Sequence, residues 1–287
     1  MTVSNAFVTM FNDEVTHSAQ TLASNLVGAV RTVRNVTGST YKFPLLGKSG
    51  AIKNKTSHQD IEAISAYDGS PTSGSLVEGD LRGAFATSKS ATIDTYSVGE
   101  YIDDFDALKT NVDLRSAYAE SLAGAMNRAY DNAIITALDT SVGAEVLAAE
   151  LTGNTLNKAG LLTIHKALND QSVPMAERYI VCGPEAYNDI ISDLANTADG
   201  PFSQALVTGM LPNAVGFNII MSTGLSAGAS SNKKCYAFSK NAVGMAVGKD
   251  ITTMVNYVPQ KLSTLIASEF SGGAVVIDPK AVVSFEA

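Results

Sequence analysis

The clearest pattern along the chain is a run of apolar residues at every fourth position between residues 113 and 138. Asp113 suits the N-cap of a helix and the segment after it contains no proline, so the pattern predicts one long helix over these residues. A spacing of four drifts relative to the 3.6 residues of a helical turn, so the apolar stripe winds slowly around the helix. We therefore expect a helix that meets different neighbours along its length. The apolar positions are Leu114, Tyr118, Leu122, Met126, Tyr130, Ile134 and Leu138.

Shorter patterns on either side predict a mixture of helices and strands. Apolar spacings of three, four and seven over residues 5–36 predict one or two helices, with Gly38 as their end. Helices and strands are largely segregated in the rest of the chain, which predicts an α+β fold. The ranges expected as helices are 157–171 and 184–194, and those expected as strands are 178–182, 217–221, 235–238, 242–247, 252–258, 262–269 and 274–285.

Residues 41–100 differ from the rest of the chain. They are rich in Thr and Ser and punctuated by Gly, with short extended stretches such as Ala91-Thr-Ile-Asp-Thr-Tyr96 and little that could form a core. This pattern predicts a long hairpin with a mobile tip near residues 69–83. A compact domain rarely tolerates such a segment unless it has a function.

Composition limits the classes of protein that the 287 residues can form. Apolar residues make up 45% and charged residues only 17%, so a large core is possible but few charges remain to solubilise a large surface. We therefore expect much of the surface to be buried against other copies of the chain. The formal net charge of −8 excludes a protein whose whole surface grips nucleic acid.

The sequence predicts neither a secretion signal nor a membrane partner. No basic residue precedes Arg31, and no apolar run reaches the roughly 18 residues that a membrane-spanning helix needs. We expect a soluble protein that is made in a cytoplasm.

No pattern in the sequence predicts an enzyme, a metal or a cofactor. Cys182 and Cys235 are too few for a disulfide framework or a four-cysteine zinc site, and we interpret them as small buried apolar residues. The three histidines share no ligand spacing, and the phosphate-loop, nucleophile-elbow and calcium-loop motifs are absent from the sequence. Asp103, Asp104 and Asp106 are close enough to suggest metal ligands, although acidic residues ahead of a helix are the commoner reason for such a group.

Charges of opposite sign are separated between two neighbouring stretches. Residues 31–55 contain only basic charges, and residues 60–80 contain only acidic ones. This separation favours contacts between copies, where a basic patch meets an acidic one and sets the register, although a solvated loop would show the same pattern. The basic residues are Arg31, Arg34, Lys42, Lys48, Lys53 and Lys55, and the acidic ones are Asp60, Glu62, Asp68, Glu78 and Asp80.

The order of these parts resembles the HK97-type capsid fold, an α+β fold with a helical N-arm, a long extended excursion, a long helix and returning strands. Several stretches are similar to the major capsid proteins of tailed phages, those of short-tailed, podovirus-type phages in particular. Together they cover most of the chain from about residue 41 to residue 287. The stretches are Phe43-Pro-Leu-Leu-Gly47, Tyr101-Ile-Asp-Asp through Val112-Asp-Leu-Arg-Ser-Ala-Tyr118 into Ala133, Val173-Pro-Met-Ala-Glu-Arg178 followed by Cys182-Gly-Pro-Glu-Ala-Tyr187, Val215-Gly-Phe217 before Ile219–Met221, and Ala242-Val-Gly244.

The resemblance implies a division of the chain into parts. The long excursion would be the E-loop, which lies across a neighbouring subunit, and the long helix would be the spine of the peripheral domain. Residues 196–212 would form the tip loop of the axial domain, where subunits meet at five-fold and six-fold centres. The implied parts are the N-arm (1–40), the E-loop (41–100), the peripheral domain (101–150), the axial domain (151–255) and the strands that return to the peripheral domain (256–287).

The resemblance also implies a function. Copies would assemble through pentamers and hexamers into an icosahedral shell around the double-stranded DNA genome, with a scaffolding protein and a portal as assembly partners. The protein would be made in the cytoplasm of a bacterial host and would reside in the virion, with weak contacts to packaged DNA and none to a membrane. The basic run 31–55 would face either DNA or the acidic group Asp103, Asp104 and Asp106 of a neighbour, and the net charge favours the neighbour.

Some relatives of this fold crosslink an E-loop lysine to an asparagine of a neighbour. Lys48, Lys53 and Lys55 are present, but nothing marks a catalytic glutamate or a partner asparagine, so we predict no crosslink.

Two other interpretations remain open on sequence alone. An encapsulin-like cellular nanocompartment would share the fold and would package a cargo enzyme instead of DNA. Alternatively, residues 155–250 could form a small-molecule-binding or hydrolytic domain with Cys182 as the nucleophile. The hydrolytic interpretation requires a positioned base, and the nearest histidine in sequence is His165, inside a predicted helix.

Overall fold

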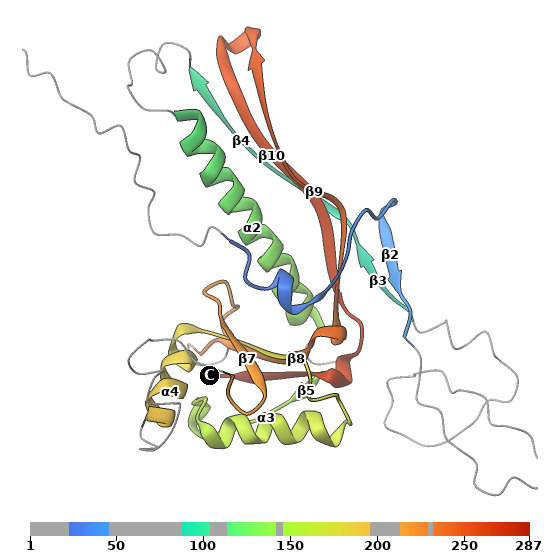
Figure 1. Ribbon diagram of the computed structural model, residues 1–287, viewed down its shortest axis with the longest axis vertical. Helices are drawn as coiled ribbons and strands as arrows, with labels where there is room; N and C mark the ends of the chain where they lie inside the picture. The colour runs from blue at the N-terminus through green and yellow to red at the C-terminus, as the bar shows by residue number, and fades with distance from the viewer. Residues whose placement is uncertain (1–22, 46–87, 104–113, 142–145, 196–212, 229–231) are drawn as a thin grey trace, which may run out of the picture.

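The computed structural model describes residues 23–45, 88–103, 114–141, 146–195, 213–228 and 232–287. An elongated upper part holds one sheet and the long helix α2, and a lower body holds a second sheet with α3 and α4 (Figure 1). In chain order the elements are β1 (Arg31–Val33), β2 (Thr40–Phe43), β3 (Lys89–Thr92), β4 (Asp94–Asp103), α2 (Leu114–Ser141), β5 (Leu147–Ala148), α3 (Lys158–Asp170), β6 (Arg178–Cys182), α4 (Pro184–Ala195), β7 (Phe217–Met221), β8 (Lys234–Ser239), β9 (Val243–Val258), β10 (Ser263–Val276) and β11 (Val282–Glu286).

The upper sheet has four strands in the order β1-β9-β10-β4. β9 and β10 form a long antiparallel hairpin, which turns through a short 3-10 helix (Pro259–Lys261) and through Leu262 in the left-handed conformation. β4 runs antiparallel along the other edge of β10, up to Asp103 opposite Ser263. β1 pairs in parallel with only the lower end of β9, where Arg31 lies opposite Gly244. The hairpin therefore extends well beyond β1.

The predicted long helix is confirmed as α2, although its first side chains depart from the expected stripe. The apolar stripe is buried from Leu122 to Leu138, whereas Tyr118 is 38% exposed. Asp113, the expected N-cap, lies outside the described residues. Midway along α2, the Tyr130 ring stacks on Phe270 of β10 at 4.2 Å between centroids, and Tyr96 of β4 stacks on Phe270 at 4.6 Å. These three rings join the helix to two strands of the upper sheet.

The lower body is a five-stranded sheet in the order β5-β11-β8-β6-β7, with α3 and α4 beside it (Figure 1). β6 and β7 are parallel and are connected through α4, as a crossover between parallel strands requires. β8 is antiparallel to both β6 and β11. The predicted helices and strands at 157–171, 178–182, 184–194, 217–221 and 235–238 are confirmed to within two residues. Asn157 caps α3, because its side-chain oxygen accepts a hydrogen bond from the Gly160 amide at 2.8 Å.

One continuous core connects the two sheets through the C-terminal half of α2. At the end of this helix, the Asp139 carboxylate accepts hydrogen bonds from the hydroxyls of Tyr236 on β8 and Ser226. At its middle, the Asp131 carboxylate accepts hydrogen bonds from the Ser24 hydroxyl and the amides of Asn25 and Leu26. These contacts fix the N-terminal segment and the lower body to the same helix.

The base of the predicted hairpin is present as the two-stranded sheet β2–β3, which pairs Thr40 with Thr92 and Phe43 with Lys89. The expected tip near residues 69–83 lies outside the described residues. Phe43 is buried against Ala246 and Ile277, in a small core of its own at the lower end of β9. Where β3 passes into β4, the backbone of Thr92 crosses β10 so closely that a Cβ atom on Gly273 would lie 1.7 Å from the Thr92 carbonyl oxygen. Only glycine fits at this crossing.

The helix prediction for residues 5–36 is wrong over its described part. Residues 27–29 form a short 3-10 helix and residues 31–33 form β1. The apolar spacing of Val30 and Val33 follows from their positions at the edge of two cores and not from a helical face. Pairing with β9, more than 200 residues away in sequence, decides the conformation.

The strands near the C-terminus also differ from the prediction. The two strands expected at 242–247 and 252–258 are a single strand, β9, which passes through an irregular pairing with β10 near Lys249. The strand expected at 274–285 is interrupted by a 3-10 helix (Pro279–Ala281) and divided between β10 and β11. β9 thus belongs to the upper sheet from Val243 onward, before the expected domain boundary at residue 255, and β11 returns to the lower sheet.

Candidate functional site

Three of the predicted basic contact residues lie near the β2–β3 stem and the lower end of β9. Arg31 and Lys42 are exposed on β1 and β2. Arg34 forms an ion pair with Asp250, whose carboxylate also accepts a hydrogen bond from the Tyr130 hydroxyl at 3.3 Å. Burial first, and then the negative charge of Asp250, raise the pKa of Tyr130 above its ordinary value. Arg34 therefore has an ion-pair partner within its own chain, although its side chain is more than half exposed.

Asp103, the described member of the acidic group, lies far from these basic residues. It ends β4 opposite Ser263, which pairs with Val258 at the top of β9, whereas Arg31 lies opposite Gly244 at the bottom. The rise along β9 between these points is about 45 Å. Among the described residues, Asp103 therefore does not meet Arg31 of its own chain, and a contact between these two positions requires two copies. The predicted contacts outside the described residues are Lys48, Lys53, Lys55, Asp60, Glu62, Asp104 and Asp106.

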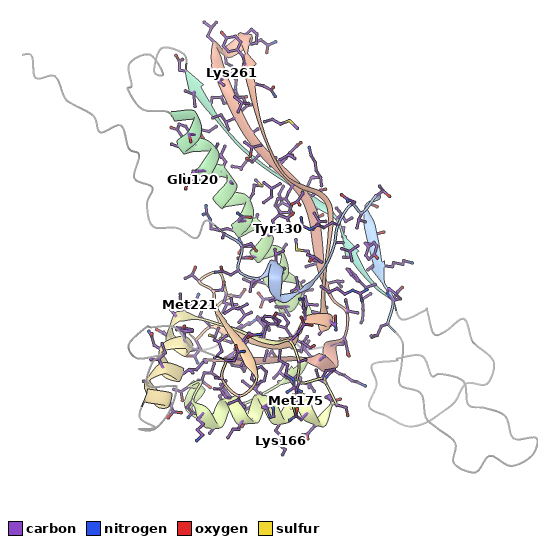
Figure 2. All side chains as sticks on the ribbon, in the orientation of Figure 1. Glu120, Tyr130, Lys166, Met175, Met221 and Lys261 are labelled. Carbon is purple, nitrogen blue, oxygen red and sulfur yellow. The ribbon has the colours of Figure 1, made fainter. Side chains whose placement is uncertain are left out.

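Apolar side chains are exposed on both faces of the sheet at the top of the β9–β10 hairpin, which sequence reasoning missed. These side chains are between 44% and 58% exposed, and Figure 2 marks the place by Lys261. The Lys261 ammonium lies 3.8 Å from the centroid of the Tyr101 ring, a cation–π contact that joins the β9–β10 turn to β4. The signal in the sequence is the uncharged, β-branched run before Pro259, which was interpreted only as a strand. The apolar residues are Tyr101, Met254, Val255, Tyr257 and Leu262.

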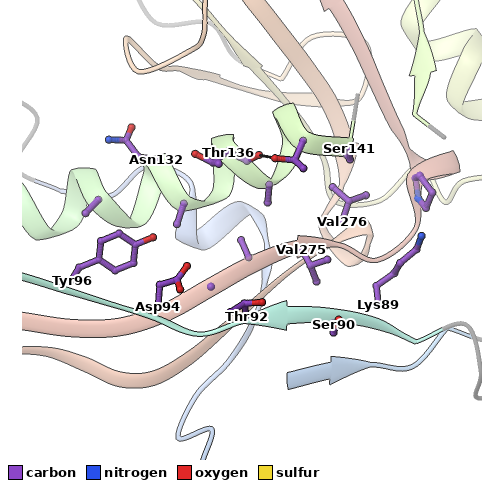
Figure 3. Close-up of a pocket in the computed structure, with 17 residues that line it drawn as sticks. Lys89, Ser90, Thr92, Asp94, Tyr96, Asn132, Thr136, Ser141, Val275 and Val276 are labelled. Carbon is purple, nitrogen blue, oxygen red and sulfur yellow. Dashed lines mark hydrogen bonds between the residues drawn. The ribbon is translucent and has the colours of Figure 1, made fainter. Parts of the chain in front are cut away.

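A groove of about 640 Å³ runs between α2 and the strands β3, β4 and β10 (Figure 3). Its helical side carries Asn132 and Thr136, and its strand side carries Ser90, Thr92 and Asp94. Small side chains and hydroxyls dominate the lining. Such a surface suits contact with another polypeptide backbone, because hydroxyls and amides can both donate and accept hydrogen bonds.

The described residues offer no support for a hydrolytic site or a metal site. Within them, no group of three or more His, Cys, Asp or Glu side chains could hold a metal ion. Cys182 and Cys235 are buried, and burial raises the pKa of the Cys182 thiol to about 12 and that of Cys235 to about 11. A thiol that stays protonated is a poor nucleophile. His165 packs edge-on against the Phe217 ring and contacts Asn169 at 3.1 Å, as a structural histidine does. None of the helices that the structure describes is long and apolar enough to cross a membrane.

Both the sequence and the fold are similar to those of known proteins. A family model described as phage capsid protein matches residues 3–72 and 81–287. No curated protein matches the chain in sequence. Among solved structures, the capsid of cyanophage P-SCSP1u is similar with a TM-score of 0.71 and 16% identity, over 98% of this chain and 93% of that one.

Two further solved structures give the same fold. A chain from Mycobacterium phage Che8 has a TM-score of 0.69 and 18% identity, with 99% of this chain and 98% of that chain covered. A virus-like particle from Pyrococcus furiosus has a TM-score of 0.55 and 12% identity, with 92% of each chain covered.

These similarities define the class of protein. The fold is the α+β HK97-like capsid fold, as the resemblance in sequence had implied. The chain belongs to the phage capsid protein family, because the family model matches nearly its whole length. It is therefore a structural protein of a viral capsid, which associates with further copies of itself in the shell.

Proposed function

We propose that the chain is the major capsid protein of a short-tailed phage. In this proposal, copies assemble through pentamers and hexamers into an icosahedral shell that encloses the double-stranded DNA genome. Membership of the phage capsid protein family over nearly the whole chain is the observation that carries it. The short-tailed assignment draws on the sequence resemblance alone.

The domain roles are part of the proposal, with boundaries that follow the sheets. We assign the peripheral domain to α2 and the β9–β10 hairpin, along whose edges the N-arm contributes β1 and the E-loop contributes most of β4, and the axial domain to α3, α4 and the five-stranded sheet. The N-arm comprises residues 1–40, and residues 196–212 form the axial tip. Residues 41–100 act as the E-loop across a neighbour, because β2 and β3 leave the body as a paired stem held by the buried Phe43.

Assembly requires partners besides the chain itself. A scaffolding protein and a portal guide closure, and synthesis takes place in the cytoplasm of a bacterial host. Packaged DNA makes weak contacts without sequence specificity, because a net charge of −8 disfavours tight binding to phosphate.

The basic residues of one copy meet the acidic residues of another in this proposal. Arg31 and Lys42 are exposed at one end of the upper part, and Asp103 is exposed at the other. Lys42→Glu should reduce the yield of closed shells, and Asp103→Lys in the same chain should restore it by reversing both charges. If DNA is the partner of Lys42 instead, the second change will not restore assembly, and the single variant will lose packaged DNA from shells that form normally.

An encapsulin-like nanocompartment is the less favoured alternative. The similarity to the Pyrococcus furiosus particle has the lower TM-score of 0.55, against 0.71 for the cyanophage capsid. The hydrolytic alternative is disfavoured, because Cys182 is buried and burial raises the pKa of its thiol.

The proposal is tested by expressing the chain alone and with a candidate scaffolding protein, followed by electron microscopy of the products. Rings of five and six, and closed uniform shells in the presence of the scaffold, are the expected products. Phage-derived shells that contain DNA would separate a virion from a cargo compartment. Shells that enclose an enzyme and no genome would contradict the proposal in favour of the nanocompartment.

A further inference from the structure

In the part of the chain that the structure describes, the outer edge of β9 is open above its lower end. β9 has β10 on one side, and β1 covers its other side only from Gly244 to Ala246. The Val247 carbonyl accepts a hydrogen bond from the Val36 amide at 3.1 Å, and the Ile251 amide donates to the Asp250 carboxylate at 3.0 Å. From Thr252 upward, no strand in the described part of the chain pairs with this edge.

The composition of the open edge makes it a template for pairing. Residues 252–258 read Thr-Thr-Met-Val-Asn-Tyr-Val, without a charge, a proline or a glycine. Val255 and Tyr257 are each 52% exposed. Natural sheets block exposed edges with charges, prolines or bulges, because an unblocked edge of β-branched and aromatic residues pairs with another chain. Between Thr252 and Val258 this edge has no such block, so we expect it to be covered in the functional state.

We propose that this edge pairs antiparallel with the same edge of a second copy, about a two-fold axis at Val255. The inference rests on the proposed shell function, in which the most abundant neighbour is another copy. Pairing about this axis sets Val255 opposite its own counterpart and Thr253 opposite Tyr257 of the second copy. Cross-strand pairs between β-branched and aromatic residues stabilise a sheet, and residues 252–258 bring no like charges together.

The faces of the sheet support this symmetry. Val255 pairs with Ile266, which is buried against Leu122 of α2, so Val255 points to the face that carries α2. A two-fold axis perpendicular to the sheet keeps α2 of both copies on one side of the joined sheets. A closed shell needs this arrangement, because every copy must present the same face to the inside.

The symmetry also places the contact within the shell. Rings of five or six subunits use heterologous contacts, in which two different surfaces meet, whereas an edge that pairs with itself is isologous. The β9 edge therefore joins neighbouring rings and not neighbours within a ring.

Crosslinking tests the pairing directly. Val255→Cys in assembled shells, treated with a short bismaleimide, should give a covalent dimer and no larger species. The native Cys182 and Cys235 are buried and give no background. Met175→Cys is the control, because Met175 is 65% exposed at the opposite end of the molecule (Figure 2). Shells in which Val255→Cys stays monomeric would overturn the inference and leave the proposed function standing. If the chain forms no shells, the proposed function fails, and the same reaction at high protein concentration still decides whether the edges pair.

A charge on the edge provides an independent test. In Val255→Lys, two ammonium groups would face each other across the axis, so closed shells should become about tenfold rarer while rings of five and six accumulate. Leu162→Lys, at a 50% exposed position on α3, is the control and should assemble normally. Wild-type yields of closed shells from Val255→Lys would contradict the proposed contact.

Discussion

At the scale of single residues, the crossing of Thr92 over β10 leaves room only for glycine at position 273. Gly273→Ala would place a methyl group against a backbone carbonyl oxygen that belongs to the β3–β4 junction, so one strand must shift. We predict a loss of at least about 2 kcal/mol in the free energy of unfolding, measured by urea denaturation of the unassembled subunit.

Gly28 is the matched control for this substitution. A Cβ atom there would have no neighbour within 4 Å, so Gly28→Ala should leave the free energy of unfolding within about 0.5 kcal/mol of wild type. Equal stability of the two variants would contradict the close approach of Thr92 and Gly273.

The buried Tyr236 predicts a pH dependence. Burial, together with the hydrogen bond to Asp139, raises the pKa of Tyr236 above its ordinary value of 10.0. Tyr236 therefore keeps its proton above pH 10 in the folded state and loses it in the unfolded state. The contribution of the Tyr236 hydroxyl to the free energy of unfolding is therefore complete below pH 10 and declines above it.

Tyr236→Phe removes both the hydrogen bond and this titration. We predict a loss of about 1–3 kcal/mol in the free energy of unfolding at pH 7, because the hydrogen bond from the Tyr236 hydroxyl to Asp139 is lost. Urea denaturation of both proteins from pH 7 to pH 11 should show the difference narrowing above pH 10. A difference that is constant with pH would show that the pKa of Tyr236 is not raised.

At the scale of elements, the sequence predicts those whose contacts are local. α2, α3 and α4 follow from apolar spacing, a capping Asn157 and a proline at a first turn, all of which act within a few residues. β6 and β7 follow from short apolar runs that a buried parallel pair requires.

Elements that depend on distant partners were mispredicted or missed. β1 carries a helical spacing and becomes a strand only because β9 lies beside it. Residues 248–251 separate the two strands expected at 242–247 and 252–258, yet pairing with β10 keeps β9 continuous through them. The same limit applies to the candidate contacts: the sign of each charge is visible in sequence, whereas the separation of Arg31 from Asp103 along the β9–β10 hairpin is not.

The anchoring of the hairpin stem tests an element as a unit. Phe43 fills the small core between β2, β3 and the lower end of β9, and its ring packs edge-on against Tyr41 at 4.8 Å. Phe43→Ala should cost about 3–5 kcal/mol of unfolding free energy. It should also speed hydrogen exchange in β2 and β3 before other strands. Met175→Ala, at an exposed position, should change neither measurement.

At the scale of the whole molecule, one chain presents several surfaces that another copy can complete. The β2–β3 stem leaves the body at its side (Figure 1), the apolar side chains at the top of β9–β10 are exposed, and Arg31 and Asp103 lie at opposite ends of the upper sheet. Only 17% of the residues are charged, and the upper edge of β9 carries no charge. Both features favour burial of the surface against other copies, as in a shell.

We propose above all that this chain closes into shells through rings of itself. The most direct measurement is the mass distribution of the purified protein, by mass photometry and then electron microscopy, as its concentration is raised with scaffold present. We expect masses at five and six times the 29.9 kDa of one chain, followed by uniform closed shells. A protein that stays a monomer or dimer at high concentration, with residues 41–100 resistant to protease, would contradict it.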